Sequence, residues 1–135
     1  MATLEGRPLE ILRDGKNYAH VAIPADDGSV QTVIVWAHAD DDGKIQLNSV
    51  EGRTWPERLR KAGKATVTLM ADGNPYEYVS IKGSLEEDTH EGADESIDQL
   101  AKKYLDEDSY PFRQPGEQRV LFTLTPEKVT YQKQG

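Results

Sequence analysis

Five basic side chains gather within twelve residues near the middle of the chain. They are Arg53, Arg58, Arg60, Lys61 and Lys64, and a single acid, Glu57, lies among them. The whole chain holds 16 basic and 24 acidic residues, so this segment reverses the overall balance. Guanidinium groups bind phosphate through two parallel charged hydrogen bonds. The cluster therefore predicts a site for a phosphate-bearing ligand.

The residues around this cluster predict how it is positioned. An apolar run from Leu47 to Val50 leads to Gly52, and Pro56 suits the first position of a helix. Free N–H groups and the positive dipole end at a helix start attract anions. The alternative interpretation is a solvated helix that happens to be basic, because most charged helix faces only contact water.

Composition narrows the class of protein. The 135 residues contain no cysteine and carry a net charge of −8. Disulfides, thiolate zinc sites and a cysteine nucleophile are therefore excluded. We expect one domain over residues 1–135, a cytoplasmic location, no membrane association and no nucleic-acid partner, because nucleic-acid binding needs a broad basic face. A small basic cluster suits a small phosphorylated molecule better.

Short β-prone runs occupy most of the chain. The runs that precede the basic helix are Tyr18–Ile23, Val30–Trp36 and Lys44–Asn48, separated by turns at 25–29 and 40–43, and we expect a three-strand meander. The later ones are Ala65–Ala71, Tyr76–Leu85, Arg119–Thr125 and Val129–Gln132, with an amphipathic helix at Ala93–Leu105 and an irregular loop at 106–118. Residues 1–16 are expected to form a helix or a packed arm. The pattern predicts a mainly β, closed or sandwiched fold.

Five motifs in order resemble one known family. They are Asp27–Trp36, Asn48-Ser49-x-x-Gly52-Arg53, Asn74-Pro75-Tyr76-x-Tyr78, Ile97-Asp98-x-Leu100-Ala101-x-x-Tyr104-Leu105, and Tyr110-Pro111-Phe112-Arg113-x-Pro115-Gly116-Glu117-x-Arg119-Val120. Together they resemble the deazaflavin-dependent branch of the pyridoxamine 5'-phosphate oxidase-like, FMN-binding split-barrel proteins. The resemblance implies a six-stranded split β-barrel with two or three short helices. It also implies a homodimer with interfacial cofactor sites, and coenzyme F420 or, alternatively, FMN as cofactor.

The resemblance also implies roles for particular residues. The strand residues Val33, Ile34, Val35 and Trp36 would line the flavin-like ring. The phosphate would be held by Asn48, Ser49, Arg53 and the start of the following helix at Thr54, with Arg58 and Lys61 as compensating cations. Trp55 would stack on a ring or cover the pocket. Tyr76 and Tyr78 would lie nearby, contributed by the same subunit or across the dimer. The chain departs from the family pattern Arg-x-Lys-x-Arg-Asn-Leu, because Trp55 replaces the Lys, Glu57 the second Arg and Arg58 the Asn. Cofactor identity is therefore less constrained than the fold.

The resemblance implies that the cofactor carries the hydride, so the protein needs no catalytic triad. Candidate proton donors are His38 and Arg113. The three histidines are isolated in sequence, so no metal site is predicted. We expect an oxidoreductase that uses reduced F420 to reduce a small unsaturated substrate. The alternatives are an FMN-dependent oxidase or reductase, and a non-catalytic binder of a flavin-like, haem or other anionic ligand.

Overall fold

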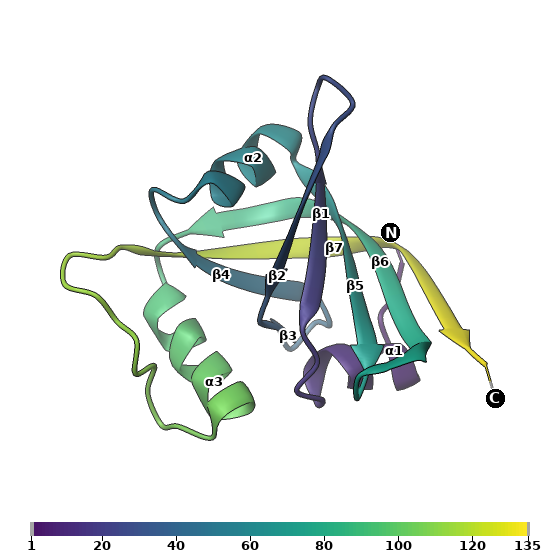
Figure 1. Ribbon diagram of the computed structural model, residues 1–135. Helices are drawn as coiled ribbons and strands as arrows, with labels where there is room; N and C mark the ends of the chain where they lie inside the picture. Colours follow the sequence, from purple (N-terminus) through teal and green to yellow (C-terminus); the bar gives the residue numbers. More distant parts are fainter. Residues whose placement is uncertain (1, 135) are drawn as a thin grey trace.

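The computed structural model describes residues 2–134; Met1 and Gly135, the ends of the predicted domain, lie outside the described residues. The chain forms a curled β-sheet with three helices around it (Figure 1). The helices are α1 (Gly6–Arg13), α2 (Thr54–Ala62) and α3 (Ala93–Leu105). The strands are β1 (Ala19–Pro24), β2 (Val30–Val35), β3 (Ala37–Ala39), β4 (Ile45–Val50), β5 (Lys64–Ala71), β6 (Asn74–Thr89) and β7 (Arg119–Lys133).

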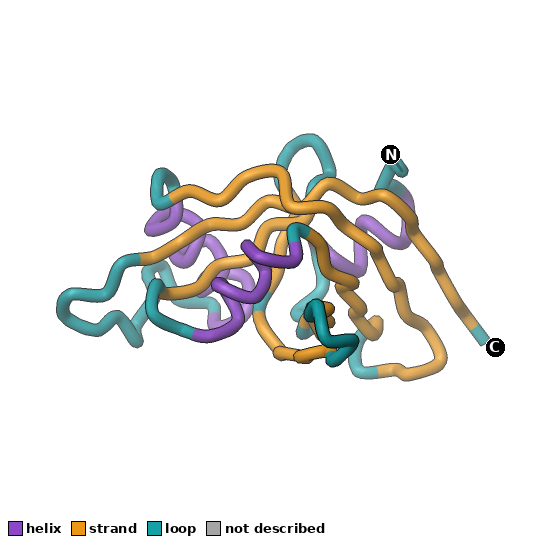
Figure 2. The backbone as a smooth tube through the Cα atoms, turned by 90° about the horizontal axis from the view of Figure 1, so that it is seen from above, coloured by secondary structure: helices purple, strands orange, loops and turns teal. Residues whose placement is uncertain are grey.

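The sheet order shows how the barrel closes. The seven strands pair in the order β2-β1-β5-β6-β7-β4-β3, so β2 and β3 lie at opposite edges. Only Trp36 separates these two strands in sequence. The sheet must therefore curl until its edges meet at Trp36, and Figure 2 shows this curvature from above. The edges are joined there by the chain itself and by no described β-ladder, which leaves the barrel split.

The hairpin predicted between β1 and β2 is confirmed, with Val21 opposite Val33. The predicted three-strand meander is wrong, because β4 pairs with β7 and with the short strand β3. The chain reverses at the predicted 40–43 turn, where the N–H of Gly43 donates to the carbonyl of Asp40 over 3.0 Å. Strand β2 ends at Val35, one residue before its predicted end at Trp36. Trp36 then connects the β1–β2 hairpin to the hairpin of β3 and β4. Strand β3 was not predicted, because Ala37-His38-Ala39 contains no β-branched residue and alanine is depleted in strands.

The last two strands are longer than the sequence pattern predicts. Pro126 was expected to divide the carboxyl-terminal segment into two strands, but β7 continues through it. Proline cannot donate to a ladder, and the pairing of β6 with β7 shifts register near Gly83, which lies opposite Pro126. The proline therefore produces a bulge and a bend in one long strand.

Helices α1 and α2 cover the two ends of the barrel core (Figure 1). From α1, Ile11 and Leu12 are buried, and α2 contributes Leu59 and Trp55, whose ring lies 5.7 Å from that of Phe122. The expected helix or packed arm within residues 1–16 is thus a helix. Helix α2 begins at Thr54, so Pro56 occupies its third position and not the expected first.

Helix α3 packs on the outside of the barrel, beside β4 and the split. Its apolar face forms a separate cluster of Ile97, Leu100 and Tyr104, against which Trp36 and Tyr110 pack. We call these five residues the α3 cluster. No helix among residues 2–134 combines the length and apolar character that membrane crossing requires.

Candidate functional site

A pocket of about 350 Å³ opens where the barrel is split. Strands β2 and β4, helix α3 and the loop before β7 supply its walls. We call it the aromatic pocket; its lining residues are Tyr18, Ile34, Val35, Trp36, Asn48, Arg53, Ile97, Leu100, Tyr110 and Arg119. Its lining combines apolar and aromatic side chains with polar groups from Asn48, Arg53 and Arg119, a combination that can hold and orient a planar organic ring.

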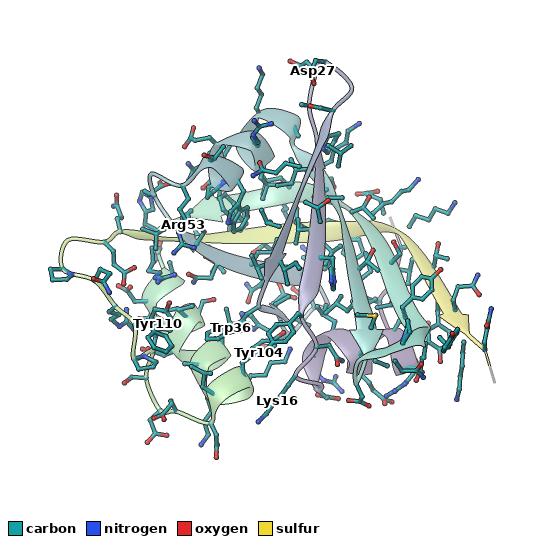
Figure 3. All side chains as sticks on the ribbon, viewed as in Figure 1. Lys16, Asp27, Trp36, Arg53, Tyr104 and Tyr110 are labelled. Carbon is teal, nitrogen blue, oxygen red and sulfur yellow. The ribbon has the colours of Figure 1, made fainter. Side chains whose placement is uncertain are left out.

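Stacked aromatic rings form one side of this pocket. Tyr104 stacks on Tyr18 with a centroid separation of 5.8 Å and on Trp36 at 5.2 Å. Tyr110 meets Trp36 edge-on at 6.1 Å. Figure 3 shows Trp36 and Tyr104 between the strands and α3, Tyr110 against α3 on the side of the loop, and Arg53 above them. Each ring fixes its neighbour, so the wall is formed before any ligand enters.

The hydroxyl of Tyr104 anchors this stack to the barrel. It donates to the carbonyl oxygen of Asn17 at 2.5 Å and accepts from the N–H of Ala37 at 3.2 Å. Burial raises the pKa of Tyr104 to about 12, although the Ala37 hydrogen bond opposes that rise. Its hydroxyl therefore stays protonated at neutral pH.

A second cavity, about 540 Å³ in volume, lies beside the first at the start of α2. We call it the basic groove; its lining residues are Pro24, Ala25, Asp26, Gly52, Arg53, Thr54, Glu57, Arg58, Lys61 and Ala62. Arg53 lines both the basic groove and the aromatic pocket. One side chain thus joins a cavity suited to a ring with a cavity suited to an anion.

Backbone geometry adds further donors to the basic groove. Helix α2 has no side-chain cap at its N-terminus, so the first N–H groups remain available. Gly52 turns the chain into this helix with φ of +99°, a conformation that side chains other than glycine rarely adopt. The groove therefore combines guanidinium groups with the positive end of a helix dipole.

The structure divides the predicted basic cluster into two groups. Arg60 binds three carboxylates, with contacts of 2.9 Å to Glu51, 2.6 Å to Glu57 and 2.7 Å to Asp88. Arg60 connects α2 with neighbouring elements. It also neutralises the carboxylate of Glu57, which lines the basic groove. No described carboxylate forms an ion pair with Arg53 or Arg58. These two guanidiniums remain available to a ligand.

The other sequence-predicted residues are distributed unevenly. Ile34, Val35, Trp36 and Asn48 line the aromatic pocket, whereas Thr54, Arg58 and Lys61 line the basic groove. Val33 packs against the barrel core, and Ser49 and Trp55 are buried, with 1% and 6% of their surface exposed. The Trp55 indole therefore offers little surface to a ring. Tyr76 and Tyr78 line neither cavity, and Tyr76 is exposed.

Neither proton-donor candidate lines the aromatic pocket. Burial, with a smaller effect from Lys103, lowers the pKa of His38 to about 4, and its Nε2 lies 3.3 Å from the Ser96 hydroxyl. The imidazole is therefore neutral at pH 7 and has no acidic proton to offer. Arg113 contacts Asp94 at 3.1 Å and Asp98 at 2.5 Å, which ties the 106–118 loop to α3.

Sequence reasoning missed five residues of the aromatic pocket: Tyr18, Ile97, Leu100, Tyr110 and Arg119. Helical periodicity predicted an apolar face containing Ile97 and Leu100 but not its partner. Tyr110 and Arg119 belong to a quoted motif, yet their contacts depend on how the loop folds back. Arg119 is a buried cation, and only its position next to an apolar strand could have indicated it. No group of three metal-ligating side chains converges anywhere in residues 2–134.

The curled antiparallel sheet, the split at Trp36 and the three helices define the class as a split β-barrel. Solved structures support this class. An F420 reductase superposes with a TM-score of 0.77 at 19% identity, covering 93% of this chain and 98% of that one. An FMN-binding protein from Syntrophomonas wolfei gives 0.61 at 16% identity, covering 91% and 84%. A protein from Listeria innocua, assigned provisionally as a pyridoxamine 5'-phosphate oxidase, gives 0.58 at 18%, covering 84% and 86%.

The predicted fold class is thereby confirmed, with seven strands in place of six and with three helices. The resemblance noted in the motifs holds at the level of the fold, since the identities are below 20%. No protein-family model matches the sequence, and no curated protein matches it.

Proposed function

We propose that this protein is an oxidoreductase that binds coenzyme F420 and transfers hydride to a small unsaturated organic substrate. The observation that carries this proposal is the position of Arg53, which lines both the aromatic pocket and the basic groove. A ligand that filled both cavities would need a planar ring joined to a phosphate. Flavin and deazaflavin cofactors have that construction.

The residues present fit such a cofactor. Ile34, Val35 and Trp36 would line its ring, while Arg53, Arg58 and the N-terminus of α2 would hold its phosphate. Bound F420 would supply the hydride chemistry itself. The protein's part is to orient the ring, exclude water from one face and compensate the phosphate charge.

A proton at the reacting substrate could come from the pocket wall. Tyr18 and Tyr110 are the lining side chains that carry hydroxyl groups. We assign them to the proposal in place of His38, which lies outside the pocket and is neutral at pH 7. Either hydroxyl can donate a hydrogen bond to a ligand within the cavity.

FMN is the alternative cofactor, because the FMN-binding protein from Syntrophomonas wolfei shares the fold. Titrating the purified protein with F420 and FMN in parallel, followed by fluorescence and calorimetry, separates the two. Tighter binding of F420 supports the proposal. Tighter binding of FMN supports the alternative, an FMN-dependent oxidase or reductase. If neither binds at micromolar concentration, the oxidoreductase proposal fails.

Replacing Arg53 by Ala tests the assignment of the phosphate site. Hydrogen bonds to charged groups contribute about 1.5–3 kcal/mol, so Arg53→Ala should weaken FMN binding about 10- to 100-fold. Riboflavin has no phosphate and should lose less affinity. Arg13→Ala is the matched control, because Arg13 is exposed, pairs with its neighbour Asp14 and lines neither cavity. Unchanged FMN affinity in Arg53→Ala would refute the assignment.

A homodimer is part of the proposal. Val30 and Ile34, on the edge strand β2, are more than half exposed, and apolar side chains in this position favour association. Tyr76 and Tyr78 would reach a cofactor from a second copy, since neither lines the aromatic pocket or the basic groove of its own chain. Sedimentation equilibrium of wild type and of Ile34→Asp measures the association state, and the variant should dissociate more readily than wild type. A monomeric wild type would remove the dimer from the proposal.

A further inference from the structure

Arg119 is a buried cation in the wall of the aromatic pocket. It stands at the first position of β7, and 7% of its surface is exposed. Its guanidinium lies 4.7 Å from the ring centroid of Tyr110, and one terminal nitrogen contacts Glu117 at 2.9 Å. Burying a guanidinium is costly unless its donors are satisfied. The contacts of its remaining donors therefore matter.

Those donors are incompletely used. The second terminal nitrogen donates to Oδ1 of Asn48 over 3.3 Å, which is long for a hydrogen bond. Nε has no partner, and less than 1 Å² of it is accessible, so neither the protein nor solvent satisfies it. An orphaned buried donor is worth about 1–3 kcal/mol of free energy to any acceptor that reaches it. The side chain that carries it lines a cavity.

The neighbouring groups define which acceptor would fit. Glu117 neutralises the guanidinium, so a full negative charge on the ligand would be uncompensated at this point. The Asn48 side chain is held by its Nδ2, which donates to the carbonyl of Ala93 over 2.8 Å. The weak bond to Asn48 allows the guanidinium to shift toward the cavity while Tyr110 still supports one face. A neutral carbonyl oxygen is the acceptor that this environment favours.

We propose that Arg119 recognises the carbonyl edge of the planar ring by donating a hydrogen bond to a ring oxygen. The ligand class is a planar heterocycle with a pyrimidinedione-type carbonyl, a feature that FMN and F420 share. The inference rests on the proposed function, because it assumes that the aromatic pocket holds the ring. It adds a residue that selects the ring chemistry, whereas Arg53 and Arg58 select the phosphate.

Two ring-only ligands isolate this contact from the phosphate site. Lumiflavin carries the ring carbonyls and no phosphate, and phenazine is a planar tricycle without carbonyls. The variants are Arg119→Lys, which keeps the charge, and the double variant Glu117→Gln/Arg119→Met, which removes both charges together. Arg13→Lys is the matched surface control. Thermal unfolding and near-UV circular dichroism of each variant verify that the pocket is folded.

The expected result is a change in ligand selectivity. The double variant should bind lumiflavin about 10- to 100-fold more weakly and phenazine within about twofold of wild type. Arg119→Lys should fall between, because an ammonium cannot reproduce the planar fork. A wild type that binds lumiflavin and rejects phenazine also supports the proposal, provided that Arg119→Lys weakens lumiflavin binding.

Two outcomes would overturn the inference. Unchanged lumiflavin affinity in both variants would show that Arg119 makes no contact with the ring. An equal loss for lumiflavin and phenazine would show that it only shapes the cavity. Either result leaves the proposed function standing if wild type binds FMN or F420. A wild type that binds none of FMN, F420 and lumiflavin would instead refute the proposed function itself.

Discussion

The barrel core and the α3 cluster are two apolar regions built in different ways. The barrel core is closed on every side by alternating strand residues and by α1 and α2, with Phe122 and Leu47 completely buried. The α3 cluster is small, aromatic and open to the aromatic pocket. Its surroundings include charged groups withdrawn from solvent, namely the partly buried Lys103 and the buried Arg119.

This difference indicates where the molecule can bind a ligand. Lys103 donates to the carbonyls of Leu12 at 2.7 Å and Ala37 at 2.6 Å, and burial lowers its pKa to about 8. Such groups add little to apolar packing and restrict the position of α3. Proteins commonly depart from simple packing rules at functional sites. The barrel core therefore provides stability, and the α3 cluster provides a preformed but incomplete enclosure.

The largest expected loss of stability comes from a substitution in the barrel core. Phe122→Ala removes a completely buried ring that packs against Trp55, so it should lower the free energy of unfolding by about 3–5 kcal/mol. Urea unfolding followed by circular dichroism measures the change. Phe112→Ala is the matched control, because Phe112 is exposed in the loop before β7, and it should change stability by less than about 0.5 kcal/mol. Similar losses in both variants would contradict the comparison.

The barrel was predictable from sequence because its signals are local. Alternation and turn residues located most strands, and the amphipathic pattern located α3 at its observed bounds, Ala93–Leu105. Strand order was not predictable from these signals. It depends on the chain passing at Trp36 from one edge strand to the opposite edge of the sheet, and on β7 continuing through Pro126. Both features are decided by long-range pairing and not by local propensity.

The candidate site was predictable only in part, for a related reason. Arg53 and Arg58 were identified as anion-binding residues, yet Arg60 appeared equivalent to them in sequence. Of its three carboxylate partners, Glu57 lies in the same helix and Glu51 just before it, but Asp88 comes from β6, 28 residues away. Likewise, nothing near Arg119 in sequence places it beside Asn48, 71 residues away. Contacts across the sheet determine which charged residues remain free.

A smaller effect sharpens the comparison at the α3 cluster. Tyr104→Phe keeps the stacked ring but leaves the Asn17 carbonyl and the Ala37 N–H without their partner. Stability should fall by about 1–3 kcal/mol, and lumiflavin affinity should fall as the wall loosens. Urea unfolding and lumiflavin titration measure the two effects. Tyr76→Phe, at an exposed position, is the control for stability and should leave the free energy of unfolding unchanged. If Tyr104→Phe matches wild type in both, the hydroxyl does not anchor the wall.

The smallest expected effect concerns His38, where β3 of the barrel meets α3. Burial and the positive charge of Lys103 lower the pKa of His38 to about 4, although Asp40 opposes this. Between the ordinary pKa of 6.5 and about 4, the unfolded chain binds a proton that the folded protein refuses, so stability falls as pH falls through this range.

Removing the imidazole should therefore make the protein less sensitive to acid. Between pH 7 and pH 5, wild type should lose on the order of 1 kcal/mol more stability than His38→Gln, a figure reduced for partial solvent screening. Urea unfolding of both proteins at the two pH values measures this difference, and the other titrating groups cancel because both proteins contain them. Parallel losses in the two proteins would mean that His38 can be protonated without separating α3 from the barrel. The contact between β3 and α3 would then tolerate a charge at His38. The difference in packing between the barrel core and the α3 cluster would therefore not include the place where they meet.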